Sequence, residues 1–219
     1  MARAAFLFLA AALLGAGICS AALRGWADAN YTSARLGLEA GKGKPSAGVL
    51  ATARAAIDEA LRFEPSNPHY VEQSALLRER QALALGRDDP QSRRLLGEAL
   101  GEFRAAARMR PGSAYAWAGI AVLKLRLREL DAEFHGAIER AVRLGPWEAQ
   151  VQVAIAQVGL AAWRRLAPAA QAQVIGMLER GLLRQEAEIR RVASAHDSIA
   201  LVCSGAALPP RLAALCVKN

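Results

Sequence analysis

The segment FHGAIERAVRLGPWE, residues 134–148, has a pattern that recurs along the chain. Two earlier segments share its frame: AAIDEALRFEPSN at 55–67 and LGEFRAAARMRPGS at 100–113. When their prolines at 65, 111 and 146 are superimposed, small or apolar residues stand twelve, eight and five places before each proline. These residues are Ala53, Ala99 and Phe134, then Ile57, Phe103 and Ile138, then Ala60, Ala106 and Ala141.

The spacing within this frame predicts helical hairpins. Separations of three and four residues place side chains on one face of an α-helix, and small alanines there let a second helix approach closely. The proline then ends the helix, because it lacks a backbone donor and disfavours helical geometry in the residue before it. A fourth copy, VIGMLERGLLRQEAE at 174–188, keeps Val174, Leu178 and Gly181 in register without the proline.

This pattern resembles the tetratricopeptide repeat, which has a period of about 34 residues, an early aromatic in its first helix and a closing proline. Trp117 occupies the early aromatic position, and the resemblance covers about residues 50–190. We therefore expect an all-α fold in which one N-terminal transmembrane helix precedes a short tetratricopeptide-like helical-hairpin solenoid. The expected divisions are an anchor or signal segment at 1–25, a helix and linker at 26–49, the repeat domain at 50–200 and a tail at 201–219.

The N-terminal residues 4–23 form an uncharged run between Arg3 and Arg24. At about 1.5 Å per residue this run matches the roughly 30 Å hydrocarbon core of a bilayer, so it predicts a single transmembrane helix. The alternative is a cleaved signal peptide, because residues 20–22 are small and suited to cleavage. Both interpretations move the bulk of the chain out of the cytoplasm. We expect a single-pass membrane protein.

The three cysteines are consistent with export. Cys203 and Cys216 flank a short stretch with little core of its own. A disulfide between them would contribute about 3 kcal/mol by loop entropy and requires an oxidising compartment; the alternative is two unpaired cysteines in the last helix. Cys19 lies in the apolar run, where we expect it to be inert.

A narrower resemblance begins in the third copy. The LGPWE joint at 144–148 and the later Gly159, Leu160 and Trp163 are similar to elements of VpsP-type proteins from bacterial exopolysaccharide gene clusters. The resemblance extends over most of the chain, including the late cysteine pair. It implies a membrane segment, a short helical-repeat domain and a role in polysaccharide production or export.

With this resemblance we expect a non-enzymatic, single-pass adaptor of a bacterial inner membrane with its bulk in the periplasm. We expect it to contact envelope proteins of a polysaccharide assembly machine and an anionic polysaccharide. The alternative is a general envelope scaffold for secretion or pilus assembly.

Residues that would carry other chemistry do not form the required patterns. His69, His135 and His196 lie far apart and lack the spacing of helical zinc sites, so we expect no metal, and no phosphate-binding loop indicates a cofactor. The formal net charge is +8, but arginines are interspersed with glutamates, which is typical of a solvated helix surface. Basic and aromatic residues do not interleave as in nucleic-acid interfaces, so we expect no nucleic-acid binding. Since the residues that would carry chemistry do not form the required patterns, we also expect no catalysis.

Six residues are candidates for binding. Solenoids present a concave surface built from the first helix of each pair, and Lys124, Arg126 and Arg128 belong to such a helix, so we expect them to line or rim that surface. The aromatic candidates pack between helices or form a platform for sugar rings; both roles stay open, and these residues are Trp117, Trp147 and Trp163. Trp147 and Trp163 are expected in one helix.

Overall fold

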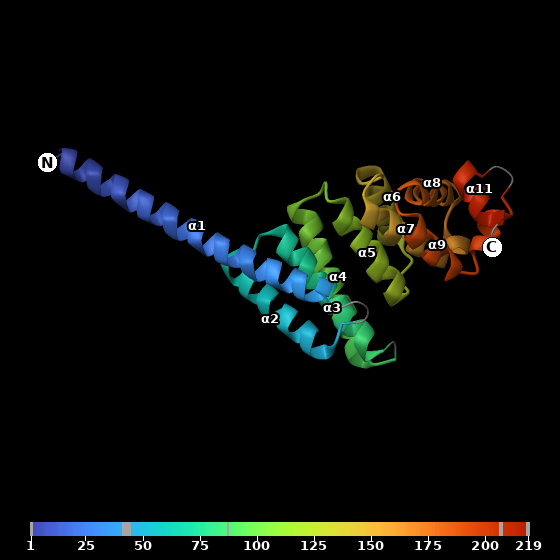
Figure 1. The fold of residues 1–219 in the computed structure, drawn as a ribbon, viewed down its shortest axis with the longest axis horizontal. Coiled ribbons are helices and arrows are strands. Elements are labelled where there is room, and N and C mark those ends of the chain that lie inside the picture. The colour runs from blue at the N-terminus through green and yellow to red at the C-terminus, as the bar shows by residue number, and fades with distance from the viewer. Residues whose placement is uncertain (1, 41–44, 87, 206–207, 218–219) are drawn as a thin grey trace.

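The structure is a computed structural model that describes residues 2–40, 45–86, 88–205 and 208–217. Over these ranges the chain is all-α and has no β-strand, as the sequence predicts (Figure 1). A 3₁₀ turn, Trp163–Arg165, follows α7. The α-helices are α1 (Ala2–Ala40), α2 (Ala47–Phe63), α3 (Pro68–Leu85), α4 (Pro90–Met109), α5 (Ala114–Leu127), α6 (Ala132–Leu144), α7 (Ala149–Ala161), α8 (Pro168–Arg184), α9 (Glu186–Ser194), α10 (Ile199–Cys203) and α11 (Pro210–Val217).

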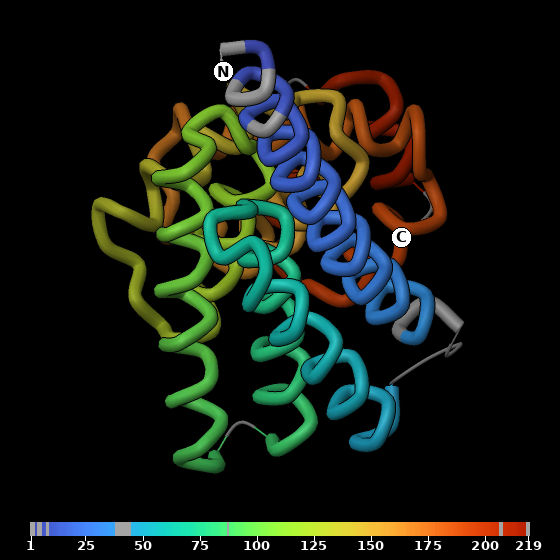
Figure 2. Tube along the Cα trace, turned by 90° about the vertical axis from the view of Figure 1, so that its left-hand side faces the viewer, coloured from blue at the N-terminus to red at the C-terminus, as the bar shows by residue number. Residues whose placement is uncertain are grey.

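Helix α1 is one continuous helix with two different surroundings. Its first part projects from the body as an isolated rod, and its last part lies beside α2 (Figures 1 and 2). The stretch Leu9–Gly37 is long and apolar enough to cross a membrane. Large apolar side chains are exposed along the rod, including Leu13, Leu14 and Ile18. The segment expected as helix and linker at 26–49 is mostly helix, and its residues 41–44 lie outside the described ranges.

The last part of α1 belongs to the folded domain. Ala27 and Ala34 are 0% and 2% exposed. Ala27 packs with Ala60 of α2 and Tyr70 of α3, and Ala34 packs in a cluster with Ile57 of α2. The first hairpin is therefore made by the end of α1 and by α2.

Successive helices pack as neighbours along the body. The pairs α1 with α2, α3 with α4, α5 with α6 and α7 with α8 form hairpins, and the first helices of the later pairs contact the preceding unit (Figure 1). Helix α9 then packs on α7 and α8. Two arms of each hairpin thus bury the helix faces that one helix alone would leave in water.

The four expected joints share one hydrogen-bonded turn. In each, the residue after the second helix donates its backbone N–H to the carbonyl of the small frame residue four places earlier. These bonds run from Glu64 to Ala60 (3.0 Å), Arg110 to Ala106 (2.9 Å), Gly145 to Ala141 (3.0 Å) and Gln185 to Gly181 (2.8 Å). All nine residues that the proline frame selects are buried, none more than 3% exposed. The frame therefore identifies both the core positions and the ends of the helices.

Two glycines let neighbouring helices approach more closely than a side chain would allow. A Cβ atom on Gly119 of α5 would lie 2.5 Å from the Cε1 atom of Phe103 on α4. A Cβ atom on Gly159 of α7 would collide with the side chain of Val174 on α8. Phe103 and Val174 are both frame residues, so each glycine accommodates a core side chain from the helix packed against it.

We expect Gly119→Ala and Gly159→Ala each to destabilise the protein by about 1–3 kcal/mol, because an added methyl overpacks a filled core. Gly97→Ala on α4 is the matched control, since nothing lies within 4 Å of its added Cβ. There the change should stabilise the helix by up to about 1 kcal/mol. Urea unfolding measures all three variants, and equal effects at buried and exposed positions would contradict the close packing.

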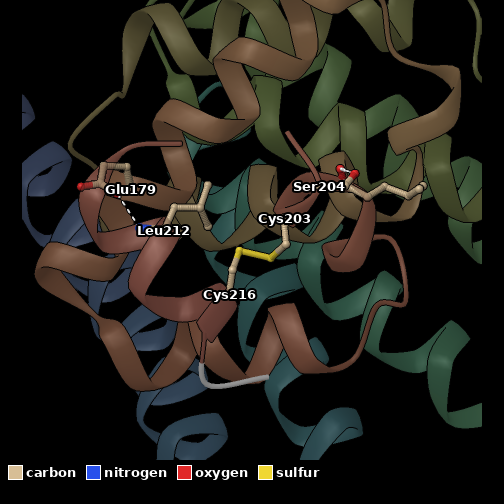
Figure 3. The surroundings of a disulfide bond; sticks show 6 residues. Glu179, Cys203, Ser204, Leu212 and Cys216 are labelled. Atoms are coloured by element: carbon tan, nitrogen blue, oxygen red, sulfur yellow. Dashed lines mark hydrogen bonds between the residues drawn. A yellow bond between two sulfur atoms is a disulfide. The ribbon is translucent and has the colours of Figure 1, made fainter. Parts of the chain in front are cut away.

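The C-terminal helix α11 is held to the body by a disulfide and a capping carboxylate (Figure 3). Cys203 and Cys216 are bonded with their Cα atoms 5.5 Å apart, which confirms the predicted bridge. Glu179 of α8 accepts a hydrogen bond from the backbone N–H of Leu212 at 2.9 Å. Leu212 and Leu215 are buried, so the tail adds its own apolar contact to α8.

Replacing both bonded cysteines, Cys203→Ser with Cys216→Ser, should weaken the docking of α11 by about 3 kcal/mol on a loop-entropy estimate. Hydrogen exchange should accelerate in α11 and stay unchanged in α3 and α4. Thiol labelling of both residues in the unreduced wild-type protein would show that the bridge does not form.

Candidate functional site

The first helices of the hairpins enclose a groove of about 960 Å³. Its walls come from the end of α1, from α3, and from the starts of α5 and α7. Polar side chains dominate the lining. They are Tyr31, Arg35, His69, Glu72, Gln73, Arg80, Arg110, Ser113, Tyr115, Glu148 and Gln150. The groove is thus the concave site that a stack of hairpins is expected to present.

A hydrogen-bonded network forms part of the groove lining. Glu72 of α3 is 4% exposed. It accepts a hydrogen bond from the hydroxyl of Ser113 at 2.8 Å and lies 3.3 Å from a guanidinium nitrogen of Arg110. Arg110 also contacts the Nε2 atom of His69 at 2.9 Å. Because these charges are matched within the protein, the network fixes the joint between α4 and α5 against α3 and offers little net charge to a ligand.

The side chains of the other polar groove residues make no hydrogen bond or ion pair with the described residues. They are Gln73 and Arg80 of α3, Tyr115 of α5, and Glu148 and Gln150 at the start of α7. Their polar atoms are therefore available to a ligand. The available charges have opposite signs on different walls, with a guanidinium on α3 and a carboxylate at α7.

Tyr115 supplies a donor in the wall of the groove. Its ring packs edge-on against Phe103, with ring centroids 6.1 Å apart. Burial, followed by the carboxylates of Glu72 and Glu79, raises the pKa of Tyr115, and the positive charge of Arg80 opposes this only in part. The hydroxyl therefore stays protonated at neutral pH and can donate a hydrogen bond to an acceptor in the groove.

Lys124 does not line the groove, which corrects the expectation from the sequence. It is 2% exposed, and its ammonium lies 3.2, 2.8 and 2.9 Å from the carboxylates of Glu129, Asp131 and Glu133. Burial disfavours its charged form, but these hydrogen bonds outweigh burial and raise the pKa of Lys124. The residue is a structural cation that ties α5 to the start of α6.

Arg126 and Arg128 do not line the groove either. The Nε atom of Arg126 lies 2.6 Å from a carboxylate oxygen of Glu79 on α3, so it links α5 to the preceding hairpin. Arg128 caps the C-terminus of α5 in the left-handed region, with φ of 63°. Lys124 and Arg126 therefore hold helices in place, whereas Arg128 marks the end of α5. All three lie beyond the groove-lining start of α5.

The three tryptophan candidates lie in different surroundings. Trp117 is half-buried, donates a hydrogen bond to the carbonyl of Pro111 at 2.9 Å, and has the guanidinium of Arg140 4.6 Å from its ring centroid. Trp163 is 8% exposed, whereas Trp147 is 54% exposed in the turn before α7. Trp117 and Trp163 therefore pack between elements, and Trp147 presents its ring to solvent.

The expectation that Trp147 and Trp163 share one helix is wrong. Helix α7 spans only Ala149–Ala161. Trp147 precedes it and Trp163 belongs to the 3₁₀ turn that follows. The two rings therefore do not form a platform along one helix face.

Comparisons with known proteins add no family assignment: no protein-family model matches the chain, and no curated protein matches its sequence. Among the residues that the structure describes, no group of three or more His, Cys, Asp or Glu side chains is placed to hold a metal ion.

Acid should weaken the ionic cluster at the start of α6. Hydrogen bonds from Arg104, and then from Lys124, hold the pKa of Glu133 at about 2, below its ordinary 4.5. A depressed folded-state pKa gives stability that is present above about pH 4.5 and is lost as the pH falls towards 2. We expect the difference in melting temperature between wild type and Glu133→Gln to shrink over this window. A difference that stays constant from pH 6 to pH 2, measured by circular dichroism, would contradict this assignment.

Proposed function

We propose that the protein is a non-enzymatic, membrane-anchored adaptor whose groove binds a component of an envelope machine. One observation carries this proposal: the helix that is apolar enough to cross a membrane continues without a break into the wall of the groove. Tyr31 and Arg35 of α1 line that wall. An anchor that is also part of a binding site suits a scaffold that collects partners at a membrane surface.

The proposed machine is that of exopolysaccharide biosynthesis or export. The LGPWE joint and the late cysteine pair support it, because both resemble elements of VpsP-type proteins. The disulfide suits an oxidising compartment, which supports an inner-membrane protein with its bulk in the periplasm. A general scaffold for secretion or pilus assembly is the second candidate, and the available charges of both signs in the groove favour a protein ligand of either machine.

The polysaccharide role is tested by deleting the gene and measuring secreted polymer. We expect secretion to fall and to be restored by the wild-type chain. Arg80→Glu reverses an unpaired groove charge and should fail to restore secretion, since charge-assisted hydrogen bonds contribute about 1.5–3 kcal/mol. Arg93→Glu on α4 is the matched control, because Arg93 is exposed and does not line the groove.

Normal secretion in the deletion strain would reject the polysaccharide role. Loss of secretion in the Arg93→Glu strain as well would show that charge reversal acts outside the groove. Equal amounts of each variant in the membrane fraction, measured by immunoblot, exclude a difference in folding.

A further inference from the structure

We infer that the groove binds the juxtamembrane segment of an integral membrane protein, as an extended peptide that carries both an acidic and a basic residue. This inference rests on the proposed function and names the occupant of the same site. Two independent features of the molecule support it: the height of the groove above the apolar run, and the signs of its available charges.

The height follows from helix geometry. Tyr31 and Arg35 stand eight and twelve residues after Leu23, the last residue of the apolar run. At about 1.5 Å per residue, they lie about 12 and 18 Å beyond it along the axis of α1. An extended chain rises about 3.3 Å per residue, so a segment that leaves the bilayer beside α1 reaches this height within about four to six residues.

The height is fixed because α1 cannot pivot where it enters the domain. Arg24, directly after the apolar run, lies 3.3 Å from the carboxylate of Glu64 at the first joint. Ala27 and Ala34 are buried against α2 and α3. Bending α1 between Ala27 and Ala34 would expose these side chains, and bending it between Arg24 and Ala27 would separate the ion pair. The groove is therefore held near the surface of the bilayer.

The available charges favour a peptide over a polyanion. Arg80 on α3 and Glu148 at the start of α7 both line the groove, and neither forms an ion pair with a described residue. A uniformly acidic polysaccharide would be attracted by Arg80 and repelled by Glu148. A peptide with side chains of both signs satisfies both walls, with its carboxylate at Arg80 and its cation at Glu148.

The uncharged groove residues suit a peptide backbone. Gln73 and Gln150 have amide groups that both donate and accept hydrogen bonds, and neither is used within the described residues. An extended backbone presents N–H and C=O groups that need such partners. The protonated hydroxyl of Tyr115 on α5 adds a hydrogen-bond donor to the same groove that Arg80 of α3 lines.

Photocrosslinking in living cells tests this inference with the full-length chain. Gln73 is replaced by the photoreactive residue benzoylphenylalanine, and Arg93 on α4 receives the same replacement as the control outside the groove. Crosslinked peptides are identified by mass spectrometry. We expect the product at position 73, and not the product at 93, to map to an integral membrane protein within about six residues of its membrane span.

A second variant tests the height of the groove above the apolar run. Seven helix-forming residues inserted between Leu23 and Arg24 lift the domain by about 10 Å and nearly preserve its facing direction, because seven residues are close to two helical turns. The packing of Ala27 and Ala34 stays intact in this variant. The same insertion between Arg3 and Ala4 lengthens the other side of the apolar run and is the control. Crosslinking from position 73 should be lost with the first insertion and kept with the second.

A product at position 73 that maps to a soluble protein, to polysaccharide or to a site far from a membrane span would overturn the inference. The same product at position 93 would overturn it as well. So would crosslinking from position 73 that survives the seven-residue insertion between Leu23 and Arg24. Absence of any product with normal protein levels would do so too. If secretion falls in the deletion strain but the crosslinks map elsewhere, the peptide occupant is rejected and the adaptor role stands. If secretion is unchanged, the polysaccharide role is rejected even where the crosslinks map as expected.

Discussion

The packing of two small residues of α1 against α2 and α3 fixes the geometry of the whole molecule. Ala27 and Ala34 have no bulk to hold the helices apart, so α1 lies directly on its neighbours and both side chains are buried. A flexible linker would let the domain sample many heights and orientations above a membrane. Here the helix that leaves the apolar run is also a wall of the groove, so the site has one height and one orientation relative to that run.

The packing of the remaining hairpins depends on one repeated joint. A small residue near the end of each second helix both permits close packing and accepts the hydrogen bond that closes the turn, as Ala106 and Ala141 do. The LGPWE joint also has hydrogen bonds to a proline carbonyl and an exposed tryptophan. The carbonyl of Pro146 receives hydrogen bonds from Gln152 and Arg180, which hold the joint to α7 and α8, while Trp147 stays exposed beside it. The distinctive residues of this joint therefore combine a firm turn with an exposed ring.

Core positions could be predicted from the sequence because burial on a helix imposes a spacing of three and four residues, as for Ile57 and Ala60. The groove could not, because polar residues such as Arg80 and Tyr115 leave no periodic signal on otherwise mixed helices. The burial of Lys124 could not be predicted, because sequence alone does not show that the carboxylates at 129, 131 and 133 lie around its ammonium. The end of α7 at Ala161 was missed because no glycine or proline stands between it and Trp163.

One distance measurement shows whether α1 is continuous from the apolar run into the groove wall. Cys19 is a free, exposed cysteine within the apolar run, and Gly97→Cys supplies a second site on α4, while Cys203 and Cys216 stay bonded. Spin labels on these two thiols in full-length protein, reconstituted in lipid nanodiscs, report their separation by pulsed electron resonance. A continuous, packed α1 predicts a single narrow distance distribution. A broad or bimodal distribution would show that the apolar run and the groove move independently and that α1 is not one rigid helix.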